Sequence, residues 1–175
     1  MIFEPAGIPG AFFIAPEKVE DGRGFFARAF CSREFAGRGL LSRIEQTSIS
    51  FNFRAGTLRG MHWQVAPKEE ARLIRCTRGA VYDVLLDLRR DSPCFTKWIA
   101  AELTGLNARA VYAPPGVAHG FQTLEGETEV LYQMSESYDP ELSQGVRWND
   151  PAFGISWPLA NPILSERDRS HPLWK

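Results

Sequence analysis

The chain alternates short apolar runs with breaks that are rich in glycine and proline. Within some of these runs the apolar residues recur at every second position. Between positions 81 and 88, large apolar side chains occupy every second residue: Tyr82, Val84, Leu86 and Leu88. In an extended chain this spacing places the four side chains on one face, so it predicts a β-strand.

Similar runs predict further strands at 11–15, 45–52, 98–103, 110–113, 120–124 and 129–135. Turn signals separate them at 78–79, 105–107, 114–116 and 125–126. One early helix is predicted over 32–38, with Ser32 as its N-cap. Many short strands at this spacing favour an all-β barrel or double-sheet jelly roll with a few short helices. The sequence shows no repeat or linker, so we expect a single domain over 1–175.

Composition narrows the class of protein. Hydrophobic residues make up 44% and charged residues 23% of the 175 positions, which is typical of a soluble globular protein. No apolar run approaches the roughly 20 residues that span a bilayer, and the first residues lack the pattern of a signal peptide. Cys31, Cys76 and Cys94 form an odd set without C-x-x-C spacing, which favours free thiols in a reducing compartment. We therefore expect a cytoplasmic protein with no membrane partner.

Charge is distributed unevenly along the chain. The formal net charge of −1 argues against a general nucleic-acid binder. Residues 1–80 hold 12 basic and 8 acidic side chains, whereas residues 81–175 hold 8 and 13. The arginine surplus of the first part could bind an anionic ligand. A solvated surface with uneven charge explains the same counts equally well.

Two segments carry candidate chemistry. The first runs from Gly56 to Gly79 around His62, and the second runs from position 114 to 123 around His119. They resemble the paired motifs of the cupin superfamily, whose jelly-roll barrel presents both segments to one interior cavity. Metal cupins generally carry His-x-His in the first segment, but here the second histidine is replaced by Gln64. Because an amide oxygen binds transition metals less well than imidazole does, a metal cupin oxygenase remains only a minor alternative.

Six strings in chain order narrow this resemblance. They are Asp21-x-Arg23-Gly24-Phe25-Phe26, Leu58-Arg59-Gly60-x-His62-x-Gln64, Asp87-Leu88-Arg89 with Ser92-Pro93-x-Phe95, Pro115-x-x-x-His119-Gly120-Phe121, Trp148-Asn149-Asp150-Pro151 and Leu164-Ser165-x-x-Asp168. Together they resemble the dTDP-4-dehydrorhamnose 3,5-epimerase family over nearly the whole chain. The resemblance implies a metal-free isomerase without a cofactor. Its substrate would be a nucleotide-diphospho-4-keto-6-deoxyhexose, epimerised at C3, C5 or both in deoxysugar biosynthesis.

The resemblance also implies roles for four catalytic residues. The C4 ketone acidifies the hydrogens on C3 and C5, so inversion requires a base, an acid on the opposite face and positive charge near O4. His62 matches the base, since imidazole has an ordinary pKa of about 6.5, and Asp168 matches the carboxylate that orients it. Tyr132 matches the acid. Arg72 stands where the family usually has the lysine beside O4, and a guanidinium fork is not equivalent to a point ammonium.

Other matching positions imply contacts with the nucleotide sugar. Arg23 and Arg59 match residues at the diphosphate, His119 and Tyr138 match residues near the nucleotide sugar, Gln46 matches a nucleotide contact, and Phe26 matches a residue against the sugar or base. Ser48 replaces a family asparagine. Taken as isolated residues, Tyr132 would more often be core and the two diphosphate arginines would more often be surface residues. A helix-start or turn aspartate is the less frequent alternative for Asp168.

Arg28 leaves the nucleotide base open. The family commonly has a glutamate here, which can accept a hydrogen bond from thymine, whereas a guanidinium has no acceptor. Either dTDP is not the preferred carrier, or Arg28 turns to solvent and dTDP still binds. The resemblance further implies a homodimer in which the segment 21–26 reaches the neighbouring subunit's site. A non-catalytic nucleotide-sugar-binding cupin is the alternative function, but the presence of His62, Asp168 and Tyr132 weighs against it.

Overall fold

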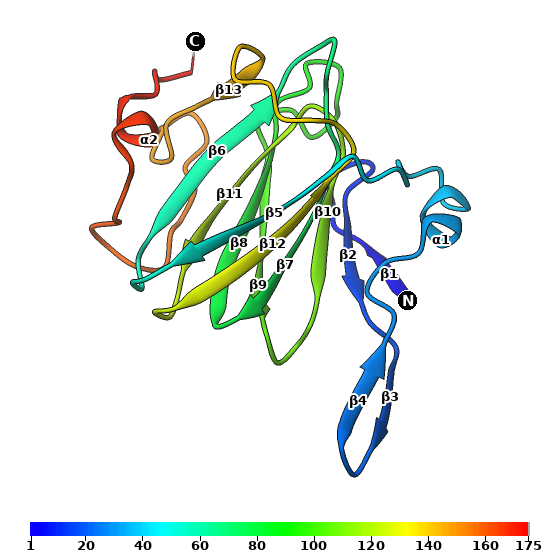
Figure 1. Cartoon of the computed structure of the whole chain (residues 1–175). Coiled ribbons are helices and arrows are strands. Elements are labelled where there is room, and N and C mark those ends of the chain that lie inside the picture. The colour runs from blue at the N-terminus through cyan, green and yellow to red at the C-terminus, as the bar shows by residue number, and fades with distance from the viewer. Residues whose placement is uncertain (175) are drawn as a thin grey trace.

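The computed structural model describes residues 1–174, and antiparallel strands dominate them (Figure 1). The strands are β1 (Ile2–Pro5), β2 (Phe12–Ala15), β3 (Lys18–Asp21), β4 (Gly24–Ala27), β5 (Gln46–Asn52), β6 (Leu58–Gln64), β7 (Arg72–Arg78), β8 (Ala80–Asp87), β9 (Trp98–Thr104), β10 (Ala110–Ala113), β11 (Val117–Thr123), β12 (Thr128–Met134) and β13 (Ser143–Gly145). The helices are α1 (Ser32–Ala36) and α2 (Glu166–Ser170).

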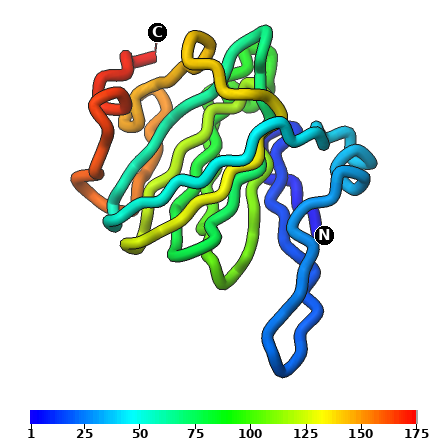
Figure 2. Tube along the Cα trace, viewed as in Figure 1, coloured from blue at the N-terminus to red at the C-terminus, as the bar shows by residue number. Residues whose placement is uncertain are grey.

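Two large sheets form the body of the protein. One has six strands in the order β1-β2-β10-β7-β12-β5, and the other has five in the order β13-β6-β11-β8-β9. The hairpin β3–β4 makes a separate small sheet that projects from the body (Figures 1 and 2). This arrangement confirms the predicted all-β jelly roll with short helices.

Apolar side chains fill the space between the large sheets and also cover part of each outer face. The central cluster includes Ile74, Leu85, Phe121 and Val130, each at most 1% exposed. Phe35 of α1 packs in a second cluster with residues of β2, β7 and β10. Aromatic residues of the C-terminal segment pack in a third cluster with the outward face of β8. The outer face of β5 stays open, with Ile49 64% and Phe51 37% exposed, and the polar cavity lies between the two sheets.

Seven predicted strands are confirmed as β2, β5, β8, β9, β10, β11 and β12, although β11 begins three residues before the predicted start. The predicted N-cap was wrong: Cys31 occupies that position, Ser32 lies inside the helix, and no side chain caps α1. Helix α1 also ends at Ala36, two residues early. Six strands were not predicted: β1, β3, β4, β6, β7 and β13. In β6 and β7 the inward-facing His62 and Arg72 interrupt the apolar alternation.

A register shift directs two β6 side chains to the same side. His62 pairs with His119 of β11, but Arg59 pairs with Phe121, so one extra residue of β6 lies between the pairs. Gly60 is in this interval with φ of 133°, and a Cβ there would lie 2.5 Å from the Gly120 Cα. Glycine therefore permits the close approach of β6 and β11. As a result, Arg59 and His62 both reach the interior.

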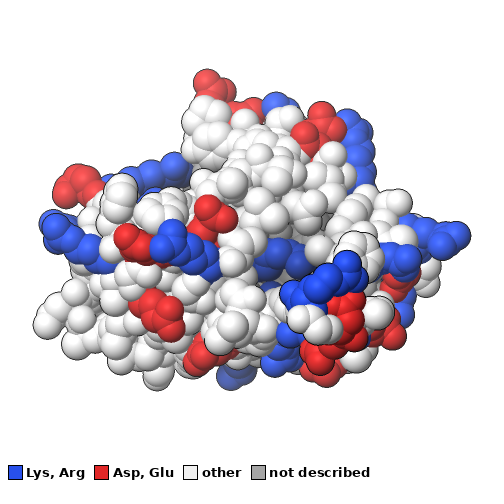
Figure 3. All heavy atoms as spheres, turned by 60° about the horizontal axis from the view of Figure 1, so that its bottom comes forward, with Lys and Arg blue, Asp and Glu red and all other residues white. Residues whose placement is uncertain are grey.

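Charge does not gather into one basic patch on the face shown in Figure 3, where blue and red side chains are mixed. Over residues 1–174, neither helix has the length and apolar character required to cross a membrane.

Candidate active site

A cavity of about 410 Å³ opens between the two sheets. Its lining residues come from β5, β6, β7, β11, β12, the segment between β12 and β13, β13 and the α2 region. They are Gln46, Ser48, Ser50, Arg59, His62, Arg72, His119, Tyr132, Met134, Tyr138, Ser143, Ser165, Arg167 and Asp168. Nine of the twelve residues predicted for the site are among them. Segments from positions 46 to 168 therefore meet at one place.

The strands that carry the core also build the cavity. The inward-facing residues of β7 are Arg72, which lines the cavity, and Ile74 and Cys76, which lie in the core. On β12, Tyr132 lines the cavity and Val130 lies in the core. Because alternate residues of a strand share a face, the rigid apolar half of each strand fixes the direction of its polar half.

His62 and Asp168 form the shortest polar contact across the cavity, with 2.5 Å between Nε2 and Oδ1. Asp168 lies in the first turn of α2, where its backbone N–H donates to the Ser165 side chain at 3.1 Å. Burial acts to raise the pKa of Asp168, but the hydrogen bond and charge of His62, together with Ser165, lower it below the ordinary value. An ionised carboxylate accepts only, so His62 Nε2 donates and Nδ1 keeps a free lone pair.

Arg72 lies beside this histidine and is held by two partners. Its Nε donates to Glu70 at 2.8 Å, its Nη2 contacts the same carboxylate, and its Nη1 donates to the His62 carbonyl oxygen at 3.0 Å. These bonds use at least three of the five guanidinium N–H groups. The charge of Arg72 is thus fixed next to His62 but is partly neutralised by Glu70.

Tyr132 reaches the cavity from the sheet opposite His62. Its ring lies edge-on to His119, with centroids 5.7 Å apart, and His119 Nε2 lies 2.8 Å from Asp83 Oδ2. Burial and the negative charge of Asp83 raise the pKa of Tyr132, although Arg72 and Arg59 oppose this. Burial also raises the pKa of Asp83, against the effect of His119. The phenol therefore keeps its proton at neutral pH and is able to donate it.

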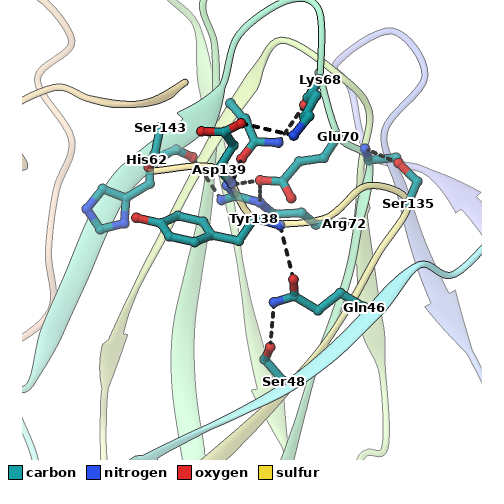
Figure 4. A network of polar contacts seen from close by, with 12 residues as sticks. Gln46, Ser48, His62, Lys68, Glu70, Arg72, Ser135, Tyr138, Asp139 and Ser143 are labelled. Atoms are coloured by element: carbon teal, nitrogen blue, oxygen red, sulfur yellow. Dashed lines mark hydrogen bonds and ion pairs between the residues drawn. The ribbon is translucent and has the colours of Figure 1, made fainter. Parts of the chain in front are cut away.

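Tyr138 lies across the mouth of the cavity, with its hydroxyl directed toward His62 (Figure 4). Its backbone N–H donates to Gln46 at 3.0 Å, and Gln46 donates to Ser48 at 3.1 Å. Arg167 donates to the Tyr138 hydroxyl at 3.2 Å and to the Ser143 hydroxyl at 3.0 Å. The mouth thus has an aromatic face beside a guanidinium, and both can contact a ligand.

Three predicted substrate residues lie away from the cavity. Arg23 pairs with Asp21 at 2.6 Å on the projecting hairpin, and Arg28 pairs with Glu34 at 2.8 Å. Phe26 is 79% exposed. Within one chain, the hairpin and the residue after it do not join the other nine.

Four further residues were missed at or beside the site. They are Glu70, which holds Arg72; Asp83, which holds His119; Arg167, at the mouth; and His171, beside Asp168. The sequence carried signals for two of them. Asp83 is a charged residue within an apolar strand, and Arg167 lies within Ser165-x-x-Asp168, a helix-start pattern that predicts α2. For Glu70 and His171 the sequence offered no comparable signal, since their partners are set by tertiary contacts.

The two-sheet barrel with its polar cavity at one end defines a cupin-type protein. Within that class the chain belongs to the dTDP-4-dehydrorhamnose 3,5-epimerase family, a family of isomerases whose model matches residues 5–175. It is 39% identical to the dTDP-4-dehydrorhamnose 3,5-epimerase of Sinorhizobium fredii, over 98% of this chain and 89% of the relative. It is also 39% identical to the dTDP-4-dehydrorhamnose 3-epimerase of Streptomyces niveus, over 97% and 82%. A crystal structure of the Bacillus anthracis 3,5-epimerase with TDP and PPi bound superposes with a TM-score of 0.91 at 40% identity, covering 94% of each chain.

Proposed function

We propose that this protein is an epimerase that inverts C3, C5 or both in a nucleotide-diphospho-4-keto-6-deoxyhexose of the dTDP-4-dehydro-6-deoxyglucose type, in deoxysugar biosynthesis. The observation that carries the proposal is the His62–Asp168 pair at 2.5 Å, which faces Tyr132 across the cavity in a member of this family. The ketone of the substrate supplies the acidity, so the chemistry requires no cofactor.

His62 removes the proton in this mechanism. Nε2 is committed to Asp168, so Nδ1 is the nitrogen that accepts the hydrogen from C3 or C5. The resulting imidazolium is stabilised by the ionised carboxylate of Asp168, which also fixes the ring orientation. Neither residue requires a conformational change to begin the reaction.

Arg72 and Tyr132 complete the cycle. Loss of the proton delocalises charge onto O4, and the guanidinium of Arg72 beside His62 stabilises that charge through its remaining N–H groups. Tyr132, on the sheet opposite His62, returns a proton to the other face of the carbon. Removal on one face and return on the other inverts the centre. Water then takes the proton from the His62 imidazolium and returns one to the Tyr132 phenolate, so both residues regain their starting states.

The remaining cavity residues hold the nucleotide sugar. Arg59 and Arg167 line the cavity with charge that suits a diphosphate. His119 is held by Asp83 at 2.8 Å and meets the sugar, while Gln46, Ser48 and Tyr138 form the nucleotide side of the mouth. The inner part of the cavity thus carries the proton chemistry, and the outer part binds the substrate.

Arg28 does not decide the nucleotide base within one chain, because its guanidinium is paired with Glu34. We favour dTDP as the carrier because the relatives named above act on dTDP sugars. Calorimetric titration with dTDP, UDP, CDP and GDP tests this choice. Affinity for dTDP at least tenfold higher, about 1.4 kcal/mol, is expected, and equal or weaker dTDP binding would refute it.

The site is completed by a second copy of the chain in this proposal. The projecting hairpin exposes Val19, Phe25 and Phe26 at its surface, and Arg23 is available to meet a diphosphate beyond its own subunit. We expect a cytoplasmic homodimer, consistent with three free thiols. A fully active monomer by light scattering at micromolar concentration would contradict the shared site.

The decisive assay is solvent exchange. The protein is incubated in D₂O with dTDP-4-dehydro-6-deoxyglucose, and NMR follows deuterium at C3 and C5 together with the configuration of the product. Deuterium and inversion at one or both carbons are expected, and the pattern distinguishes a 3-epimerase from a 3,5-epimerase. Binding without exchange would instead support the non-catalytic alternative.

A further inference from the structure

His171 is the third histidine of the chain, and the proposed mechanism does not use it. It follows α2 directly, and its Nε2 lies 3.7 Å from Asp168 Oδ1, the same oxygen that His62 contacts. The His171 and His62 rings are 5.5 Å apart, centroid to centroid, at 67°. His171 Nε2 is buried and has no hydrogen-bond partner among the described residues. His171 Nε2 thus lies near a carboxylate oxygen that already contacts His62, and it makes no hydrogen bond itself.

We propose that His62, Asp168 and His171 form a binding site for a borderline divalent cation such as Zn²⁺, and that occupation of this site inhibits the enzyme. Within residues 1–174 these three side chains make up the one His/Cys/Asp/Glu cluster whose ligand atoms all lie within 4.8 Å of one another. Two imidazoles and one carboxylate are a ligand set that Zn²⁺ prefers, with the cavity supplying the open fourth position.

The spacing fits such an ion after small movements. Ligand bonds of roughly 2.0–2.1 Å in a tetrahedron place neighbouring ligand atoms about 3.3 Å apart. The 2.5 Å separation of His62 and Asp168 must open, and the 3.7 Å separation of Asp168 and His171 must close slightly. The ligand atoms of His62 and His171 lie within 4.8 Å of each other and must also come to about 3.3 Å. His171 is held for this role, because a Cβ on Gly145 would collide with its ring, and Arg147 donates to its backbone carbonyl at 3.0 Å.

Occupation would block the base directly. An ion on His62 Nε2 displaces the hydrogen bond to Asp168 and moves the ring proton to Nδ1, the atom that accepts the substrate proton. Arg72, Arg59 and Arg167 line the same cavity and oppose a cation, so the expected affinity is micromolar and the ion competes with the anionic substrate. The inhibition readout rests on the proposed function, whereas metal binding does not.

The test compares wild type with His171→Ala at fixed free Zn²⁺, using the deuterium exchange assay. We expect wild type to lose activity reversibly at micromolar Zn²⁺, with recovery on chelation and no response to Mg²⁺. His171→Ala should keep its basal rate within about twofold and require at least tenfold more Zn²⁺, since loss of a direct ligand exceeds the roughly 10–100-fold effect of outer partners. Equal sensitivity of the two proteins would overturn the proposal.

Two additions keep the result interpretable. His171→Gln repeats the substitution with a side chain that fills the space, and Cys31→Ser combined with Cys94→Ser should retain full Zn²⁺ sensitivity; its loss would place the ion on the thiols instead. Co²⁺ titration of wild type should give visible absorption bands of a four- or five-coordinate ion, which are absent in His171→Ala. This spectrum needs no turnover, so a failed epimerase assay leaves the metal site testable, and identical spectra in both proteins would refute it.

Discussion

Two histidine–aspartate pairs have their histidines on neighbouring strands, and their surroundings differ sharply. His62 and His119 are cross-strand neighbours on β6 and β11. The His62 side chain is 27% exposed and contacts Asp168, whose pKa is lowered, whereas the His119 side chain is 3% exposed and contacts Asp83, whose pKa is raised by burial. The same residue types can therefore serve different tasks: a half-buried histidine beside an ionised carboxylate suits proton transfer, and a fully buried pair suits rigid positioning of a ligand contact.

The strongest way to break this comparison is to remove either member of the His62–Asp168 pair. His62→Ala and Asp168→Ala should each reduce deuterium exchange at C3 and C5 by about 10²–10⁴-fold, because the base or its orienting charge is lost. Circular dichroism should show an unchanged fold. Near-native turnover in the His62 variant would contradict its role as the base.

Tyr132→Phe tests the proposed acid on the sheet opposite His62. Proton removal by His62 remains possible, so solvent exchange with retention should persist, while inversion falls by on the order of 10²-fold because the acid is missing. NMR of the product in D₂O measures both quantities in one sample. An equal, small decrease in exchange and inversion would show that Tyr132 acts in packing or binding.

Substitution of Arg72 tests how much positive charge the reaction at His62 and Asp168 requires. Arg72→Gln should lower kcat by about 10–10²-fold, less than complete loss of an oxyanion donor can cost, because Glu70 already neutralises part of the charge. Since the single variant leaves Glu70 as an unpaired buried charge, Glu70→Gln with Arg72→Gln is the matched control. A rise in KM alone in both variants would make Arg72 a binding residue.

Replacement of the two aspartates should change the pH dependence of the unfolding free energy in opposite directions. The lowered pKa of Asp168 gives stability that is present above its unfolded pKa and is lost as pH falls through the folded value. The raised pKa of Asp83 gives stability that is present below its unfolded pKa and is lost as pH rises. Asp168→Asn should therefore flatten the acid-side decrease in unfolding free energy, and Asp83→Asn should steepen it, when urea unfolding is compared from pH 7 downward. Shifts of the same sign would remove this distinction.

The sequence predicted much of the barrel because its central strands carry regular apolar alternation, as β8 does at Val84 and Leu86. It failed at β6 and β7, where His62 and Arg72 face a cavity and break that pattern. The residues predicted from the family resemblance met in one cavity in nine of twelve cases. Contacts set by tertiary packing, such as Glu70 with Arg72 and His171 with Asp168, had no local signature in the chain.

The most direct test of the difference between the pairs is a side-by-side exchange measurement on Asp168→Asn and Asp83→Asn at saturating dTDP-4-dehydro-6-deoxyglucose in D₂O. Both substitutions replace one carboxyl group and keep the side-chain shape. The proposed mechanism predicts that Asp168→Asn loses exchange at C3 and C5 by on the order of 10² or more, while Asp83→Asn raises KM and keeps kcat within about tenfold. Loss of kcat in Asp83→Asn equal to or greater than that in Asp168→Asn would contradict it.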